Sequence, residues 1–73
     1  MKTQLTQQEQ KIYDCLRQNP GRVLSAAELY RMVWQQEPYG ADNVVAVHIY
    51  HLRRKLKKGA IRTVWRRGYR YEE

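Results

Sequence analysis

Residues 42–56, with the sequence DNVVAVHIYHLRRKL, bring aromatic, cationic and hydrogen-bonding side chains together in one short segment. If this segment is a helix with about 3.6 residues per turn, one side of it is a narrow apolar stripe made by Val45, Ile49, Leu52 and Leu56. The opposite arc is mixed and contains Asn43, Ala46, Val47, Tyr50, His51 and Arg54. Amide, phenol, imidazole and guanidinium groups on one arc suit hydrogen bonding to a polar partner, and cations at its edges favour a partner with negative charge.

The sequence contains no arrangement suited to catalysis or to metal binding. It has one cysteine, so no disulfide can form within the chain, and its two histidines, His48 and His51, lack the spacing of a zinc site. Cys15 falls on the apolar stripe of an expected helix, which favours a small core residue over a nucleophile. We therefore expect no enzyme activity, no cofactor and no metal site.

The composition indicates a small basic domain. The 73 residues include 14 Lys and Arg against 7 Asp and Glu, a formal net charge of +7, so the surface potential attracts polyanions, nucleic acid first among them. An anionic membrane surface would also suit this charge, but no apolar run approaches the roughly 20 residues that cross a bilayer, and no secretory signal follows Met1. We expect a soluble, cytoplasmic protein, too short to enclose a large active site.

Two capping boxes predict the first two helices. In the pair Thr6 and Glu9, and again in Ser25 and Glu28, each side chain can satisfy a backbone N–H that the first helical turn leaves without a partner. The sequence NPG at 19–21 stops the first helix, because a proline disfavours helical geometry in the residue before it. Two helices are therefore expected, at residues 6–18 and 26–35.

A third helix and a terminal hairpin complete the expected fold. The sequence QQEPYGA interrupts the second helix, after which Asp42 can cap a helix over 43–57. Residues 22–24 (RVL) are too few for anything but a short strand, and the alternating residues 61–71 predict a hairpin that turns at RRG. Three helices with a small β wing make a mainly α, α+β winged helix-turn-helix.

Several spaced motifs give the chain a resemblance to a known family. The motifs LT..E, NPGRVLS..EL...VW, D.VV.VHI..LRRKL and I.TV...GYR, in this order, cover Leu5 to Tyr71. Together they resemble the winged helix-turn-helix effector domain of OmpR/PhoB-type bacterial response regulators. The wing sequence TVWRRGYR is closer to the TVxRRGYR variant of ToxR/CadC-like regulators than to the glycine-tipped TVRGxGY of typical response regulators.

The chain departs from that family at its beginning. The family usually places a four-stranded antiparallel sheet before the first helix, whereas only Met1 to Gln4 precede Leu5 here. A receiver domain that accepts a phosphoryl group is also missing from the sequence. We therefore expect one winged helix-turn-helix domain over residues 1–73, either a fragment or a small stand-alone regulator, without that sheet and without control by phosphorylation.

The resemblance implies double-stranded DNA as the partner and assigns roles by position. The helix at 43–57 would lie in the major groove and contact base edges through Asn43, Ala46, Val47, Tyr50 and His51, with Val47 against a thymine methyl. Contacts to the DNA backbone would come from Trp34, Val44, His48, Arg53, Arg54, Lys57, Thr63 and Tyr69. Arg66 and Arg67 on the wing, 61–71, are expected at the minor groove, because a narrow groove concentrates negative potential and attracts arginine. Family members act in pairs on repeated half-sites, so pairing on DNA is expected.

Several of these residues have a structural alternative. Tyr50 and His51 are otherwise solvated or packed on the wing, and His48 is otherwise a partly buried histidine with satisfied hydrogen bonds. Trp34 either donates its indole N–H to a phosphate or packs in the core. Trp65 either stacks on a sugar or fills the space under the wing, and we favour the second.

Two other functions compete with sequence-specific DNA binding and transcription regulation. In one, the exposed helix or the loop QQEPYGA, residues 35–41, binds another protein, and the resemblance suggests RNA polymerase. In the other, the winged helix binds RNA. Neither alternative includes a membrane or a small-molecule substrate.

Overall fold

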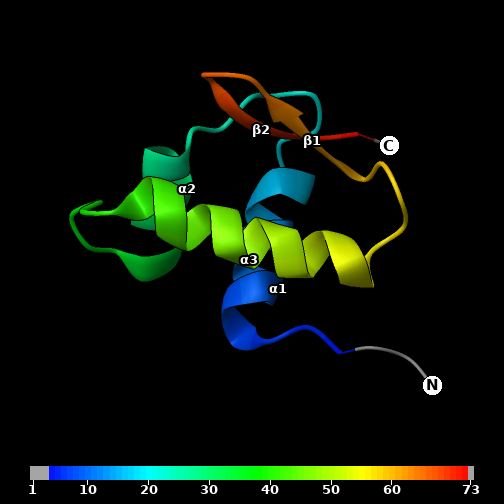
Figure 1. Cartoon of the computed structure of the whole chain (residues 1–73), viewed down its shortest axis with the longest axis horizontal. Helices are drawn as coiled ribbons and strands as arrows, with labels where there is room; N and C mark the ends of the chain where they lie inside the picture. Colours follow the sequence, from blue (N-terminus) through cyan, green and yellow to red (C-terminus); the bar gives the residue numbers. More distant parts are fainter. Residues whose placement is uncertain (1–3, 73) are drawn as a thin grey trace.

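The computed structural model describes residues 4–72, which form three helices followed by a β-hairpin (Figure 1). The elements are α1 (Gln7–Arg17), α2 (Ala26–Trp34), α3 (Ala41–Lys55), β1 (Ile61–Val64) and β2 (Gly68–Tyr71). The predicted α+β winged helix-turn-helix is confirmed, and within the described residues the sheet consists of the two hairpin strands alone. The remaining residues of the predicted 1–73 domain, 1–3 and 73, lie outside the described part of the chain.

Both predicted capping boxes are present. The backbone N–H of Glu9 donates to the Thr6 hydroxyl over 3.2 Å, and the Glu9 carboxylate accepts from the Thr6 N–H over 2.9 Å. Ser25 and Glu28 repeat this exchange over 3.1 and 2.9 Å, and the bond from the Ser25 backbone is the main reason that the pKa of Glu28 lies below its usual 4.5. Because each box fixes the first turn, α1 and α2 match the predicted helices to within one residue at each end.

The third helix begins earlier than predicted, and Asp42 does not cap it. The residue before α3 is Gly40, whose φ of 67° is a left-handed conformation that glycine adopts without steric cost. This turn brings Ala41 into the core as the first helical residue, so Asp42 lies inside the first turn, where a carboxylate suits the positive end of the helix dipole. The helix spans 41–55, two residues earlier at both ends than predicted.

The core lies between the three helices and the base of the hairpin. The helices contact one another pairwise, and the fully buried side chains of this core are Ile12, Leu16, Leu24, Leu29, Val45, Ile49 and Leu52, of which Leu24 lies just before α2. The predicted apolar stripe of α3 is therefore confirmed, except that Leu56 follows the helix and is only partly buried. Cys15 packs against this core as a partly buried residue. Burial, and then the nearby charge of Asp14, raise the pKa of its thiol.

The hairpin is fastened to the start of α2. Of the predicted strand at 22–24, only Leu24 pairs, and it exchanges two backbone hydrogen bonds of 2.9 Å with Tyr69. The neighbouring Gly68 approaches so closely that a Cβ there would lie 2.1 Å from the Leu24 carbonyl oxygen. These contacts hold the hairpin, near its turn, against the helical body, and the hairpin lies along one edge of that body, at the top of Figure 1, with β2 contacting α1.

Candidate nucleic-acid interface

The mixed arc of α3 faces outward along its whole length. Its six members are all exposed: Asn43, Ala46, Val47, Tyr50, His51 and Arg54. Two of them are large hydrophobic side chains: the aliphatic Val47 is 54% exposed and the aromatic Tyr50 is 56% exposed. Such side chains gain by being covered, so the arc is suited to contact with a partner that offers both apolar and hydrogen-bonding groups.

Three members of the arc contact one another at its C-terminal end. The Arg54 guanidinium donates to the Tyr50 hydroxyl over 3.1 Å and lies 5.7 Å from the centre of that ring. The rings of Tyr50 and His51 meet edge to face, with 5.5 Å between their centres. These contacts stay within α3, in contrast to the alternative in which Tyr50 and His51 pack on the wing. Since the Tyr50 oxygen accepts from Arg54, its own O–H is available to donate outward.

His48 and Trp34 lie beside the arc in a row of partly buried rings. Tyr30 stacks on Trp34 with 4.9 Å between ring centres, and the edge of His48 meets Trp34 at 5.2 Å. His48 Nδ1 lies 2.8 Å from the Val44 carbonyl oxygen. A carbonyl only accepts, so Nδ1 carries the hydrogen, and the second ring nitrogen can donate to a phosphate only when the ring is protonated. Core packing and phosphate contact are therefore compatible roles for this pair.

The backbone N–H of Val44 already has a hydrogen-bond partner and is not free to donate to a phosphate. Its N–H donates to the Gly40 carbonyl over 3.2 Å, and its own carbonyl accepts from His48. The side chain is half-buried and apolar. A contact between Val44 and the DNA backbone is thus limited to the sugars.

Arg53 joins α3 to the wing. Its Nε donates to the Ile61 carbonyl over 3.2 Å, a second nitrogen donates to the Thr63 hydroxyl, and its guanidinium lies 5.9 Å from the centre of the Tyr69 ring. Three residues that were predicted to contact the DNA backbone, Arg53, Thr63 and Tyr69, are thereby brought together. Nothing in the sequence indicated this link, because it joins Arg53 to residues eight to sixteen positions away, beyond the loop between α3 and β1.

The wing tip is an exposed turn that contains Trp65, Arg66 and Arg67. The Arg67 N–H donates to the Val64 carbonyl over 2.9 Å and closes a turn over residues 65–67, one residue earlier than the predicted turn at RRG, because Gly68 already pairs with Val64 as the first residue of β2. Trp65 is 77% exposed, so the favoured expectation that it fills the space under the wing is wrong. The reason is that β1 ends at Val64, before Trp65, and that the Leu24 backbone already occupies the space beneath the hairpin.

The wing tip and the start of α3 border one cleft of about 410 Å³, whose lining includes Ala26, Asp42, Thr63, Arg66 and Arg67. The first turn of α2 forms a third side of it, through Ser25, Ala26 and Ala27. Asp42, in the first turn of α3, is the helix residue of this lining, so the start of α3, where the arc begins at Asn43, adjoins the wing arginines. Asp42 is the acidic residue of this cleft and was not among the predicted site residues; its place in the first turn of α3, corrected above, puts it there.

The cations of this face are not neutralised by ion pairs. The pairs are Asp14 with Arg17 at 2.8 Å, Glu28 with Arg22 at 3.8 Å, Glu9 with Lys55 at 2.7 Å and Glu72 with Arg70 at 2.7 Å. Within residues 4–72, none of these pairs includes Arg54, Arg66 or Arg67. Lys57 is exposed as well, in the loop after α3 and not on the helix as predicted. The four paired carboxylates neutralise other cations, and Asp42 is the one carboxylate in the lining of the cleft, where Arg66 and Arg67 outnumber it.

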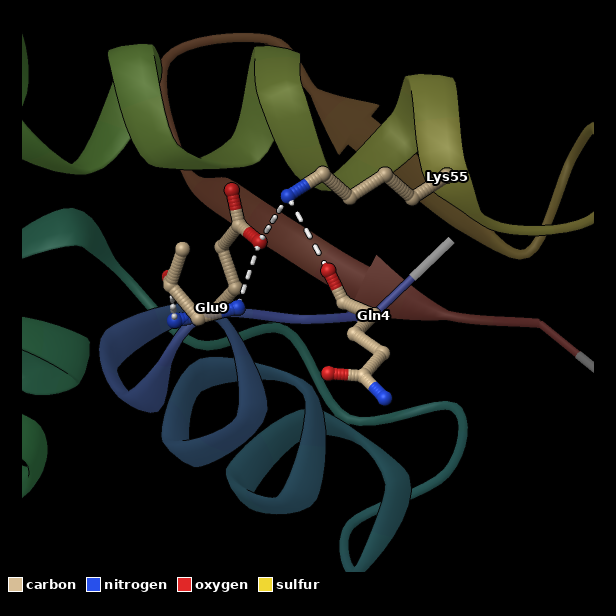
Figure 2. Close-up of polar contacts among 4 residues, drawn as sticks. Gln4, Glu9 and Lys55 are labelled. Carbon is tan, nitrogen blue, oxygen red and sulfur yellow. Dashed lines mark hydrogen bonds and ion pairs between the residues drawn. The ribbon is translucent and has the colours of Figure 1, made fainter. Parts of the chain in front are cut away.

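Lys55 turns away from this face and holds α3 on α1. Its ammonium group lies 2.7 Å from the Glu9 carboxylate and 3.3 Å from the Gln4 carbonyl (Figure 2). Glu9 is only 4% exposed. Burial raises the pKa of Glu9, but the hydrogen bonds from Lys55 and Thr6 and the charge of Lys55 together lower it by more, so that it lies below its usual 4.5. Lys55 is therefore a structural cation.

Among residues 4–72, no three potential metal ligands lie together. None of the helices described here is long and apolar enough to cross a membrane.

Comparison with known proteins places this geometry among transcription regulators. A family model described as "Transcriptional regulatory protein, C terminal" matches residues 1–71. The uncharacterized transcriptional regulatory protein YclJ of Bacillus subtilis is 40% identical over 72 residues, covering 94% of this chain and 32% of YclJ. The DNA-binding domain of CpxR from E. coli superposes with a TM-score of 0.83 at 29% identity, over 96% of this chain and 74% of that one. The RstA DNA-binding domain of Klebsiella pneumoniae, solved in complex with the RstA box, superposes with a TM-score of 0.85 at 24% identity, over 94% of this chain and 73% of that one. The chain spans about a third of the length of YclJ.

Proposed function

The chain belongs to the family of C-terminal domains of transcriptional regulatory proteins, and from this premise we propose that it binds double-stranded DNA sequence-specifically and thereby regulates transcription. Membership confirms the predicted resemblance to OmpR/PhoB-type effector domains. The observation that carries the proposal is the exposed arc of α3, whose first turn borders, through Asp42, the same cleft as the wing arginines Arg66 and Arg67. The complex of the RstA domain with its box supports it, since the two chains share this fold.

In this proposal α3 enters the major groove, which is wide enough for one helix and presents a distinct set of donors, acceptors and methyl groups at each base pair. Asn43 can pair with an adenine through its amide, and Val47 covers a thymine methyl. Tyr50 and His51 supply further donors to base edges, and Ala46 leaves room for close approach. These residues set the preferred sequence.

Contacts to the DNA backbone supply most of the affinity. Arg54, Lys57 and the protonated ring of His48 can donate to phosphates around the major groove, and the indole N–H of Trp34 lies in the same row. Arg66 and Arg67 lie at the minor groove. If about six phosphates are neutralised, the logarithm of the binding constant falls against the logarithm of salt concentration with a slope of roughly 5.

Selection of bound sequences from a random duplex pool tests this function. On the selected site, Asn43→Ala or His51→Ala should relax the preference at particular base pairs by about 1–3 kcal/mol each. Changing Arg66 and Arg67 to Ala should instead weaken binding to every duplex and reduce the salt slope by about 2. Failure to enrich any sequence, with structured RNA or heparin competing as well as duplex DNA, would refute the proposal.

The proposed setting follows from the family. We place the domain in the bacterial cytoplasm as a DNA-binding module without enzyme activity that acts in pairs on repeated half-sites. The second candidate partner is RNA polymerase, through residues 35–41.

A further inference from the structure

The tip of the wing carries an aromatic side chain that no role in the fold explains. Trp65 is 77% exposed, and the guanidinium of Arg66 lies over its ring, 4.4 Å from the centre. Stacking occupies one face of the guanidinium and leaves the N–H groups in its plane free to donate. The pair is thus a flat apolar surface joined to a set of hydrogen-bond donors.

Arg66 keeps this position in an unfavourable backbone conformation. Its φ is 64°, in the left-handed region that residues other than glycine seldom adopt. Strained residues of this kind concentrate at functional sites, where the rest of the structure holds them in place. Glycine adopts this φ without steric cost, so the arginine side chain stands here against the local backbone preference.

Contacts at both ends of the hairpin fix where the tip points. Leu24 and Tyr69 exchange two backbone hydrogen bonds, Gly68 touches the Leu24 backbone, and Arg53 ties β1 to α3. The tip therefore projects in a set direction beside the cleft that it shares with α3. A partner held by α3 meets Trp65 without any rearrangement of the wing.

We propose that Trp65 is a DNA-contacting residue whose indole packs on the deoxyribose sugars at the edge of the minor groove and holds Arg66 in place for the groove. This rests on the proposed function. Duplex DNA is the partner that the charge favours, because Arg66 lies over the ring, Arg67 follows it in the turn, and neither forms an ion pair among residues 4–72. Sugar C–H groups supply the apolar surface, and the adjacent phosphates supply acceptors.

Binding of Trp65→Ala and Trp65→Phe to the selected duplex and to an unrelated duplex measures the contact. Trp65→Ala should weaken both by about tenfold with an unchanged salt slope, because no charge is lost, and Trp65→Phe should keep most of the affinity. Neither change should move the urea midpoint, since the ring is exposed. Arg66→Ala should cost less in a Trp65→Ala background than in the wild type, whereas Arg67→Ala should cost the same in both.

A direct signal comes from the wild-type chain labelled with 5-fluorotryptophan. It gives two ¹⁹F resonances, from Trp34 and Trp65, which the Trp65→Phe chain assigns. The Trp65 resonance should lose its sensitivity to solvent when duplex is added. The inference is overturned if the wild type binds its duplex while this resonance stays unchanged, as for a ring that serves a protein partner, or if Trp65→Ala binds like the wild type. If the wild type binds no duplex, the proposed function falls with it.

Discussion

Replacement of Lys55 by methionine tests how the orientation of α3 is maintained. Methionine keeps most of the apolar stem of lysine but removes the ammonium group that lies 2.7 Å from Glu9 and 3.3 Å from the Gln4 carbonyl. The Glu9 carboxylate, 4% exposed, would then keep its bond from the Thr6 N–H and lose its counter-charge. A carboxylate left in that state strongly favours unfolding at neutral pH.

The size of the effect follows from the burial of the two partners. Breaking a buried ion pair by removing one partner costs about 3–5 kcal/mol. The Lys55 side chain is 23% exposed, so water can reach the carboxylate after the substitution, and we expect about 2–3 kcal/mol. A domain of 73 residues has a total stability of about 4–11 kcal/mol. The melting temperature should fall by roughly 10–20 °C.

Urea denaturation followed by circular dichroism measures the loss, with Lys58→Met as the matched control. Lys58 is exposed, so this variant loses the same charge at the surface. The pKa of folded Glu9 lies below 4.5, so the pair stabilises the fold above that pH, and its contribution is lost as the pH falls through the folded value. The difference between wild type and Lys55→Met should therefore shrink between about pH 7 and about pH 3.

Two results would refute this reasoning. One is a Lys55→Met chain as stable as Lys58→Met at neutral pH, which would mean that water replaces the ammonium group at no cost. The other is a stability difference from the wild type that stays constant into the acid range, because the loss would then not depend on the ionised carboxylate. Glu9→Gln, which cannot ionise, should show a flatter acid dependence than the wild type.

Three further predictions concern the wing and the core. Gly68→Ala should destabilise the fold by about 3 kcal/mol or more in urea, since its Cβ would meet the Leu24 carbonyl at 2.1 Å; a neutral result would contradict that close approach. Arg53→Ala should cost about 1 kcal/mol of stability and weaken DNA binding by loosening the wing, and binding at wild-type strength would show that the link is dispensable. Cys15 should react with iodoacetamide more slowly than a free cysteine until urea unfolds the chain, because its raised pKa keeps it a thiol; equal rates would argue against its burial.

The sequence predicted those parts of the fold that local patterns control. The capping boxes at Thr6 and Ser25 fixed the start of α1 and α2, and the apolar period of α3 separated its buried stripe from its exposed arc. The start of α3 was missed because Asp42 has the chemistry of a cap, whereas the left-handed turn at Gly40 and the burial of Ala41 decided the matter. The burial of Ala41 in the core therefore outweighed the preference of Asp42 for the N-cap position.

Long-range contacts were beyond the reach of those patterns. The place of Trp65 depended on where β1 ends and on how closely the Leu24 backbone approaches the hairpin, and neither is encoded in the alternation of residues 61–71. The bond from Arg53 to the wing and the bond from Lys55 to α1 join segments distant in sequence. A run of basic residues indicates an electrostatic surface, but it does not say which members belong to it.

The sequence LRRKL shows how the fold divides such a run. Successive residues of a helix point about 100° apart, so Arg53, Arg54 and Lys55 leave α3 in three directions. Arg53 reaches the wing, Lys55 reaches Glu9 on α1, and Arg54 lies on the exposed arc beside Tyr50. The two outer cations fix the position of α3 against the hairpin and against α1, which are the two elements that decide what the arc can face. Only Arg54 remains available to contact a partner. Three neighbouring residues of the same charge therefore have three different roles.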